Sequence, residues 1–373
     1  MPRAVLVLVV FILIGTFAFF IFLNIAIKLQ RIVQTKRTND KMKVIKKTVA
    51  ALLSCPENEF TESLGNFTRI IWKKGRSYMF LVDQYLQSIL ENPEQENRQR
   101  LITIANLLGF ASECTNQIKS RNSRISAMGA RRAGLYHCEE VAEHMVAALD
   151  FLSSENQFEI LMGLARLGKA EPMIQAFEKI KNSIIINERA VIEILLSFPS
   201  GTEKAALFKF MLGHQTTYLA ALCLKAIDRE TATDLMDEII KILRNGDKEN
   251  RAAAVKALAA LNKDAPVKEL IMALEDPVWE IRALAAKALG HTDVYEASLA
   301  LFHALKDKQW WVRQNSAMAL SNHSGYEKFF LLAAAKSGDK YAVNSIISTL
   351  QTIGNTVLID YIKDFAAKEP AAL

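Results

Sequence analysis

A spacing of 31 residues recurs along the chain, and this period constrains the fold more than any other feature of the sequence. The ends of eight apolar, helix-like segments follow it, at His137, Gly168, Pro199, Glu230, Leu261, Thr292, His323 and Gly354. A period of this length is typical of stacked supersecondary units, each of which buries its faces only against its neighbours. The sequence therefore predicts a repeat array over most of the chain.

Each unit is expected to hold two helices, because apolar residues after position 28 recur at spacings of 3, 4 and 7 with no sustained alternation. Most prolines fall between these segments, where helix ends and first turns tolerate them. The run Ser183–Ile186 is strand-like but too short and isolated to build a sheet. The first helices are expected at 171–181, 203–212, 231–243, 267–275, 295–306 and 327–337. The predicted fold class is therefore all-α.

Two units carry a recognisable pattern in which Asp is followed by Ile-Arg or Val-Arg, then Ala, then Ala-Leu. It lies at 275–291 and again at 306–323. The pattern resembles the HEAT repeat, especially its short, PBS-lyase-like form, clearly over 246–323 and more weakly over 124–245 and 324–368. The resemblance implies a right-handed HEAT-type α-solenoid. A single amino-terminal span before such an array is similar to bacterial inner-membrane HEAT-repeat proteins, some of which accompany cell-envelope glycosyltransferases.

The Asp and Arg residues of this pattern are expected to be structural. Asp276 and Asp307 precede their second helices, where a carboxylate can accept free N–H groups and complement the helix dipole. Arg282 and Arg313 follow six residues later, and Arg251 occupies the same register one unit earlier. In HEAT arrays, these residues form a ladder by bonding to the Asp of their own or the adjacent unit. Anion binding by these arginines is the alternative.

The amino terminus predicts a transmembrane helix at 4–27, because these 24 positions carry no charge. A helix of this length is roughly 36 Å long and spans a hydrocarbon core of ~30 Å with some tilt. A cleaved signal peptide would need a shorter apolar region and a small-residue cleavage site, neither of which is clear. The remaining boundaries are a basic linker or helix at 28–56, a divergent helical region at 57–123 and the solenoid at 124–368.

Eight cations follow the predicted span: Lys28, Arg31, Lys36, Arg37, Lys41, Lys43, Lys46 and Lys47. Because positive charge remains on the cytoplasmic side, the short amino terminus is expected outside and the large domain in the cytosol, at a bacterial inner membrane. The four scattered cysteines, predicted to be reduced and buried, agree with that side. The same cations are candidates for contact with anionic lipid.

Motifs that would carry chemistry are weak. Gly163–Lys169 matches GxxxxGK but lacks the following Ser or Thr and a preceding strand, so Gly168 is better interpreted as a helix C-cap. His137, Glu140, Glu143 and His144 share one predicted helix, without a second cluster to complete a metal site. No GxSxG motif is present. The sequence therefore predicts no enzyme, no cofactor and no metal site. The alternative function of a different class is enzymatic: a HEAT-like lyase acting on a chromophore.

Aromatic residues recur in phase with the repeat: Trp279, Trp310 and Tyr341 are 31 residues apart, and Trp311 adjoins them. All lie at or just before the start of second helices. They either pack between loops along the stack or form an exposed row that anchors a protein partner, since Trp and Tyr dominate interface hot spots. These four residues are the candidate partner-binding site.

Charge is distributed unevenly. Residues 28–132 hold 19 Lys and Arg against 9 Asp and Glu, whereas residues 133–373 hold 26 against 31. Simple solvation explains such a basic half. Near a membrane, anionic lipid or an acidic protein is a better alternative partner than nucleic acid.

Taken together, these features favour a non-catalytic, membrane-tethered scaffold that binds an unidentified protein through its cytosolic solenoid. An envelope or polysaccharide biosynthesis complex is the expected setting.

Overall fold

A computed structural model describes residues 3–92, 96–180, 187–213, 217–336 and 340–368. Within these ranges side chains are described except at 3–15, 18, 154–155, 217–218, 334–336 and 365–368. The described residues contain helices and connecting turns and no strand. The strand-like run at 183–186 lies outside them. By its contacts the chain divides into two compact units, residues 1–141 and 142–373.

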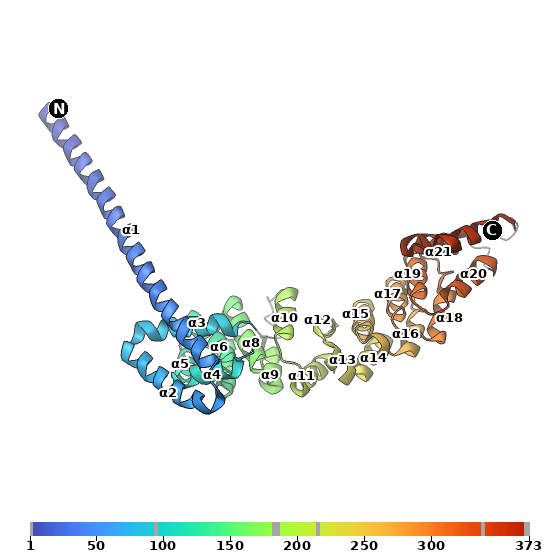
Figure 1. Ribbon diagram of the computed structural model, residues 1–373, viewed down its shortest axis with the longest axis horizontal. Helices are drawn as coiled ribbons and strands as arrows, with labels where there is room; N and C mark the ends of the chain where they lie inside the picture. Colours follow the sequence, from blue (N-terminus) through green and yellow to red (C-terminus); the bar gives the residue numbers. More distant parts are fainter. Residues whose placement is uncertain (1–2, 93–95, 181–186, 214–216, 337–339, 369–373) are drawn as a thin grey trace. The chain divides into compact units, whose positions relative to one another are not determined.

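The first unit is built on one long helix, α1 (Arg3–Leu53), drawn in blue in Figure 1. Its described side chains between positions 16 and 40 are exposed, whereas Ile45, Val49 and Leu52 are buried. These three residues lie where α1 packs on α2 (Glu57–Lys74) and α3 (Arg76–Leu90). Only the carboxy-terminal end of α1 therefore belongs to the core of this unit.

Within the part of the chain whose side chains are described, no helix is both long enough and apolar enough to cross a lipid bilayer. Twelve of the positions in the predicted span, residues 4–15, and also residue 18 lie outside that part.

Three further helices complete the first unit: α4 (Arg98–Leu107), α5 (Phe110–Ile118) and α6 (Ser123–Leu135). α5 and α6 lie very close together because Gly129 has no side chain. A Cβ at this position would stand 2.7 Å from the Cβ of Gln117 and 3.0 Å from the backbone nitrogen of Ile118. This close approach brings the polar residues of the two helices together, as described below.

The second unit consists of helices that alternate between two layers along the chain (Figure 1). One layer contains α7 (Ala142–Ala148), α9 (Ala170–Ile180), α11 (Thr202–Gly213), α13 (Arg229–Asp234), α14 (Met236–Asn245), α16 (Val267–Ala273), α18 (Tyr295–Ala304), α20 (Tyr326–Lys336) and α22 (Thr356–Lys368). The other contains α8 (Ser154–Leu167), α10 (Glu188–Leu196), α12 (Thr217–Ala226), α15 (Lys248–Ala259), α17 (Trp279–Leu289), α19 (Trp310–Ser321) and α21 (Lys340–Ile353). Each helix of the second layer packs against the next, as expected for an α-solenoid.

The predicted first helices lie within one or two residues of α9, α11, α16, α18 and α20, with one exception. The segment 231–243, expected to be one helix, is divided into α13 and α14 at Leu235, whose backbone leaves the helical region with φ −108° and ψ 21°. Leu235 and Ile239 are both buried on either side of the break. A regular helix would place these two residues on the same face as well, so the apolar periodicity does not predict this break.

Small residues set the spacing of the second layer. Ala254, Ala285, Ala286 and Ala317 are buried in α15, α17 and α19, and Leu289 is fully buried at the end of α17. Gly168 ends α8 in the left-handed region with φ 69°, as a helix C-cap does. All four cysteines are free thiols, of which three are buried and Cys55 is partly exposed.

Candidate partner-binding site

Arg and Asp side chains link three successive units of the second layer, and we call this set, Arg251, Asp276, Arg282, Asp307 and Arg313, the Asp/Arg ladder. Arg251 donates from Nε and Nη2 to the two carboxylate oxygens of Asp276 at 2.8 and 3.1 Å. Arg282 makes the same two bonds to Asp307 at 2.7 and 3.0 Å. Each arginine therefore pairs with the Asp of the following unit, in the bidentate geometry that suits guanidinium and carboxylate.

The ladder also fixes the turns before the second helices. Nη1 of Arg282 donates to the carbonyl oxygen of Asp276 at 2.8 Å, and Nη1 of Arg313 donates to that of Asp307 at 2.8 Å. Asp307 accepts the N–H of Gln309 at 2.8 Å. Burial alone would raise the pKa of Asp307, but its hydrogen bonds from Arg282 and Gln309 outweigh burial and hold the pKa below its ordinary value. Asp307 thus remains an anion between two units.

Arg313 differs from the two arginines before it. Its side chain is buried and donates from Nη1 to the carbonyl oxygens of Asp307 and Lys308, but its Nε has no hydrogen-bond partner. Among the side chains that the structure describes, none places a carboxylate on this guanidinium. The ring of Tyr341 lies 5.3 Å from its Cζ. Within the described part of the chain, the Nε that holds an Asp in Arg251 and Arg282 therefore has no hydrogen-bond partner in Arg313.

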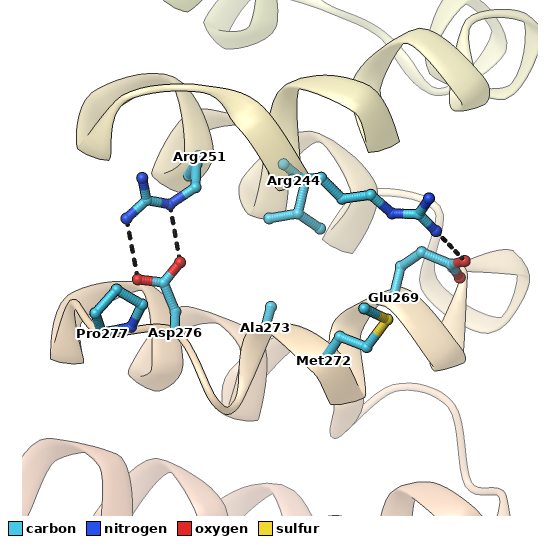
Figure 2. A pocket seen from close by; sticks show the side chains of 8 residues that line it. Arg244, Arg251, Glu269, Met272, Ala273, Asp276 and Pro277 are labelled. Carbon is cyan, nitrogen blue, oxygen red and sulfur yellow. Dashed lines mark hydrogen bonds and ion pairs between the residues drawn. The ribbon is translucent and has the colours of Figure 1, made fainter.

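A groove of about 490 Å³ lies beside the first rung of the ladder, between α14 and α16. Figure 2 shows the Arg251–Asp276 pair at one end and Arg244, bonded to Glu269 at 3.3 Å, at the other. Met272 extends between the two pairs and is exposed. Because the four charged side chains are paired with each other, this groove offers no convergent group for acid, base or nucleophilic chemistry.

The aromatic residues that recur with the repeat, Trp279, Trp310, Trp311 and Tyr341, are called the aromatic ridge below. Trp310 is 47% exposed, Trp311 55% and Tyr341 56%, whereas Trp279 is partly buried. The rings of Trp310 and Trp311 pack edge to face with centroids 4.6 Å apart. Packing between loops therefore does not cover these three side chains, and large aromatic surface remains available at the starts of α19 and α21.

A second apolar groove, of about 670 Å³, lies between α16 and α18. Tyr295 and Leu299 line it, and Tyr295 is 69% exposed. The rings of Tyr295 and Phe302 both lie about 6 Å from that of Phe329 in α20. The sequence analysis did not identify this cluster, because spacing does not show which rings meet across α18 and α20.

The eight cations that follow the predicted span divide into two groups. Lys41 donates to the hydroxyl of Ser77 at 3.1 Å and lies over the ring of Tyr78, and Lys46 lies over the ring of Tyr85. Both contacts are with α3. The other six side chains extend into solvent along α1: Lys28, Arg31, Lys36, Arg37, Lys43 and Lys47. Lys46 is exposed as well, so seven of the eight candidate lipid contacts are accessible and Lys41 is partly buried.

The first unit contains a buried polar network that sequence analysis missed, here called the Arg132 network: Asp83, Glu113, Gln117, Arg132 and Tyr136. Arg132 is 4% exposed and donates to Gln117 at 2.9 Å, Glu113 at 3.0 Å and Asp83 at 3.1 Å. Tyr136 donates its hydroxyl hydrogen to Asp83. Burial and the adjacent Asp83 carboxylate raise the pKa of Tyr136 well above its ordinary value. A pocket of about 310 Å³ lies beside the network.

Metal-binding chemistry finds no support in the described residues, where no three His, Cys, Asp or Glu side chains lie close enough to hold an ion. This includes His137, Glu140, Glu143 and His144. Burial lowers the pKa of His137, and the charge of Arg98 lowers it further.

Comparison with known proteins gives one family match, to HEAT repeats, over residues 267–329. No curated protein matches the sequence. Among solved structures, the chain is similar to an engineered protein from a structural genomics consortium, with 18% identity, a TM-score of 0.36 and coverage of 88% of this chain and 92% of that chain. It is also similar to human deoxyhypusine hydroxylase in complex with glycerol, with 15% identity, a TM-score of 0.27 and coverage of 72% and 94%.

The matched segment contains α16, α17, α18 and α19, together with the rung formed by Arg282 and Asp307. The helical pairs, their packing and the family match agree. Residues 267–329 are therefore HEAT repeats, and the helical pairs on either side of them pack in the same two-layer arrangement.

Proposed function

We propose that this protein is a non-catalytic scaffold that binds a partner protein through the aromatic ridge of its HEAT repeats. HEAT repeats generally mediate protein–protein interaction. The observation that carries the proposal is the exposure of Trp310, Trp311 and Tyr341, which present large, rigid surface at one register of two successive units. Residues of this type supply most of the binding energy in protein interfaces.

The competing function is an enzyme of the HEAT-like lyase type. Such an enzyme needs a closed pocket in which titratable groups converge on a substrate. The groove beside the ladder instead contains ion pairs that satisfy one another, and the groove between α16 and α18 is open and mainly apolar. This difference favours binding over catalysis.

Replacing Trp310 by Ala tests the proposal. We expect partner capture by the purified full chain to weaken by at least ~2 kcal/mol, as hot-spot truncations do, with little change in melting temperature because the side chain is exposed. Trp72→Ala is the matched control, because Trp72 is 63% exposed and belongs to α2 of the first unit. Unchanged capture by Trp310→Ala, or an equal loss from Trp72→Ala, would remove the ridge as the binding site.

We further propose that residues 4–27 anchor the scaffold in a bacterial inner membrane, with the repeats in the cytosol. The uncharged run and the cations that follow it support this arrangement. Lys28 and Arg31, within one turn of the end of the proposed span on the continuous helix α1, then lie near the membrane surface, where anionic lipid attracts each by about 1 kcal/mol. An envelope or polysaccharide biosynthesis complex is the proposed setting.

Protease accessibility tests this topology. Protease added to intact spheroplasts should leave the 41.7 kDa chain nearly whole, whereas protease added after lysis should digest it. Digestion of the repeats from outside would reverse the proposed orientation. Recovery of the chain in the soluble fraction after lysis would remove the membrane anchor and leave the ridge proposal intact.

A further inference from the structure

The aromatic ridge crosses from one second-layer helix to the next. Trp310 and Trp311 begin α19, and Tyr341 lies in the first turn of α21, 31 residues after Trp310. α19 and α21 pack directly against each other. Because the axes of packed helices lie about 8–10 Å apart, residues at one register of two such helices are separated by a similar distance. The ridge therefore presents aromatic side chains at intervals of about 8–10 Å.

The exposed area of the ridge limits what it can bind by itself. Trp310, Trp311 and Tyr341 are each about half exposed. An aromatic side chain has about 150–250 Å² to bury, so the three together offer roughly 300 Å². A stable interface between two folded proteins takes about 800 Å² from each partner. The ridge is thus too small for a folded surface or for a second copy of this chain, and it suits a short linear segment.

The spacing of the ridge selects the conformation of such a segment. A polyproline II helix has three residues per turn and a rise of about 3.1 Å, so every third side chain returns to one face after about 9.3 Å. An extended strand returns after about 6.8 Å, and an α-helix after about 5.4 or 10.8 Å. An α-helical ligand would also need a groove for its apolar stripe, and neither groove described above is lined by a ridge residue. The polyproline II repeat therefore fits the ridge best.

The two adjacent indoles suit a proline ring. Trp310 and Trp311 meet with centroids 4.6 Å apart and ring planes at 73°, so they form a corner with two apolar walls. Each indole also carries one N–H donor. The backbone carbonyls of a polyproline II helix are free to accept such donors, because this helix has no internal hydrogen bonds. Aromatic-lined surfaces recognise proline-rich segments through these two kinds of contact.

We propose that the partner segment bound on the aromatic ridge is a proline-rich polyproline II helix, in which prolines three residues apart pack on the Trp310–Trp311 pair and on Tyr341. This inference rests on the proposed function, because it assigns the chemistry of the ligand at the same ridge. A polyproline II helix is largely formed before it binds, so little conformational entropy is lost on binding. This compensates in part for the small area of the ridge.

Two peptides of identical composition test the inference on the purified full chain. The first has Pro at every third residue, separated by Ala and Gln. The second has the same prolines at alternating intervals of two and four residues, so that no two of them lie one turn apart on the same face. We expect the first peptide to bind about tenfold tighter, as measured by tryptophan fluorescence and calorimetry. Equal affinity, no binding of the first peptide, or tighter binding of a helix-forming peptide with Leu at every seventh residue would overturn the inference.

Variants of the ridge locate the peptide. Trp310→Ala and Tyr341→Ala should each weaken binding of the first peptide about tenfold, because each removes one of two contacts that lie one turn apart. Tyr361→Ala is the matched control, since Tyr361 is 59% exposed on α22 and does not belong to the ridge. An equal loss from Tyr361→Ala would contradict the proposed location. If Trp310→Ala prevents partner capture but neither peptide binds, the scaffold function stands and the proline-rich ligand is wrong. If Trp310→Ala weakens the peptide but not partner capture, the proposed function is wrong for that partner.

Discussion

The Asp/Arg ladder of the second unit and the Arg132 network of the first unit differ in how their arginine side chains are paired. Both satisfy a half-buried or buried guanidinium with carboxylates from other helices. In the repeats, one Arg meets one Asp at a constant offset of 25 residues, and the pair recurs. In the first unit, one Arg collects three acceptors from α3 and α5, at offsets of 49, 19 and 15 residues. A regular ladder repeats one pair from unit to unit, whereas the network gathers several acceptors on one guanidinium and still leaves its buried Nε without a partner among the described residues.

The largest expected effect lies in the Arg132 network. Arg132→Met should destabilise the first unit by about 3–5 kcal/mol, because it leaves Asp83 buried without its counter-charge. Arg282→Met should cost less, about 1–3 kcal/mol, because one rung then loses a single carboxylate pair. Urea unfolding combined with hydrogen exchange measures both values in the two units. A larger loss for Arg282→Met would reverse the comparison.

A core substitution measures how far damage spreads in the repeats. Leu289 is fully buried, so Leu289→Ala should cost about 2–5 kcal/mol. Because each unit contacts only its neighbours, hydrogen exchange should accelerate in α17 and the adjoining helices and remain slow in the first unit. An unchanged melting profile would show that the core has been misplaced.

Close helix contacts at glycine occur in both units and provide a matched pair. A Cβ at Gly290 would lie 2.9 Å from the Cα of Ala319, and one at Gly129 would lie 3.0 Å from the backbone of Ile118. Gly129→Ala and Gly290→Ala should each cost about 1–3 kcal/mol, because backbone cannot move aside as a side chain can. Gly65→Ala is the control, since nothing lies within 4 Å of its Cβ position. It should be neutral or slightly stabilising by thermal melting.

The smallest expected effect is a loss of stability of the repeats at acidic pH. Burial alone would raise the pKa of Asp228, but Lys204, 2.8 Å away, and the N–H and hydroxyl of Thr231 outweigh burial and lower the pKa to about 2. The carboxyl therefore contributes stability above its ordinary pKa, and this stability is lost as the pH falls from about 4 to 2. Asp228→Asn should flatten the stability profile in that window. A profile as steep as that of the original chain would mean that other carboxyls control it.

The Asp/Arg ladder shows which pairings the sequence pattern alone can predict. The Asp and Arg positions could be identified from the sequence, but two pairings were open, within a unit or between units. The structure pairs Arg251 and Arg282 each with the Asp of the following unit. Spacing alone does not fix this direction, because both Asp residues stand at the same register.

Exposure of the aromatic ridge likewise could not be inferred from spacing. A 31-residue recurrence places Trp279, Trp310 and Tyr341 at one register, but it does not say which neighbours cover them. In the structure Trp279 is partly covered, whereas Trp310 and Tyr341 are about half exposed. The difference arises from the packing around each helix start, which the sequence does not encode locally.

The sequence by itself determined the helical class, the two-helix units, their boundaries and the register of the ladder, because these depend on local periodicity and on a repeat that copies its own contacts. Tertiary structure alone decided the break at Leu235, the contact of Lys41 and Lys46 with α3, and the Arg132 network. The last two join residues from helices that share no repeat, so only close packing of the chain in three dimensions brings them together.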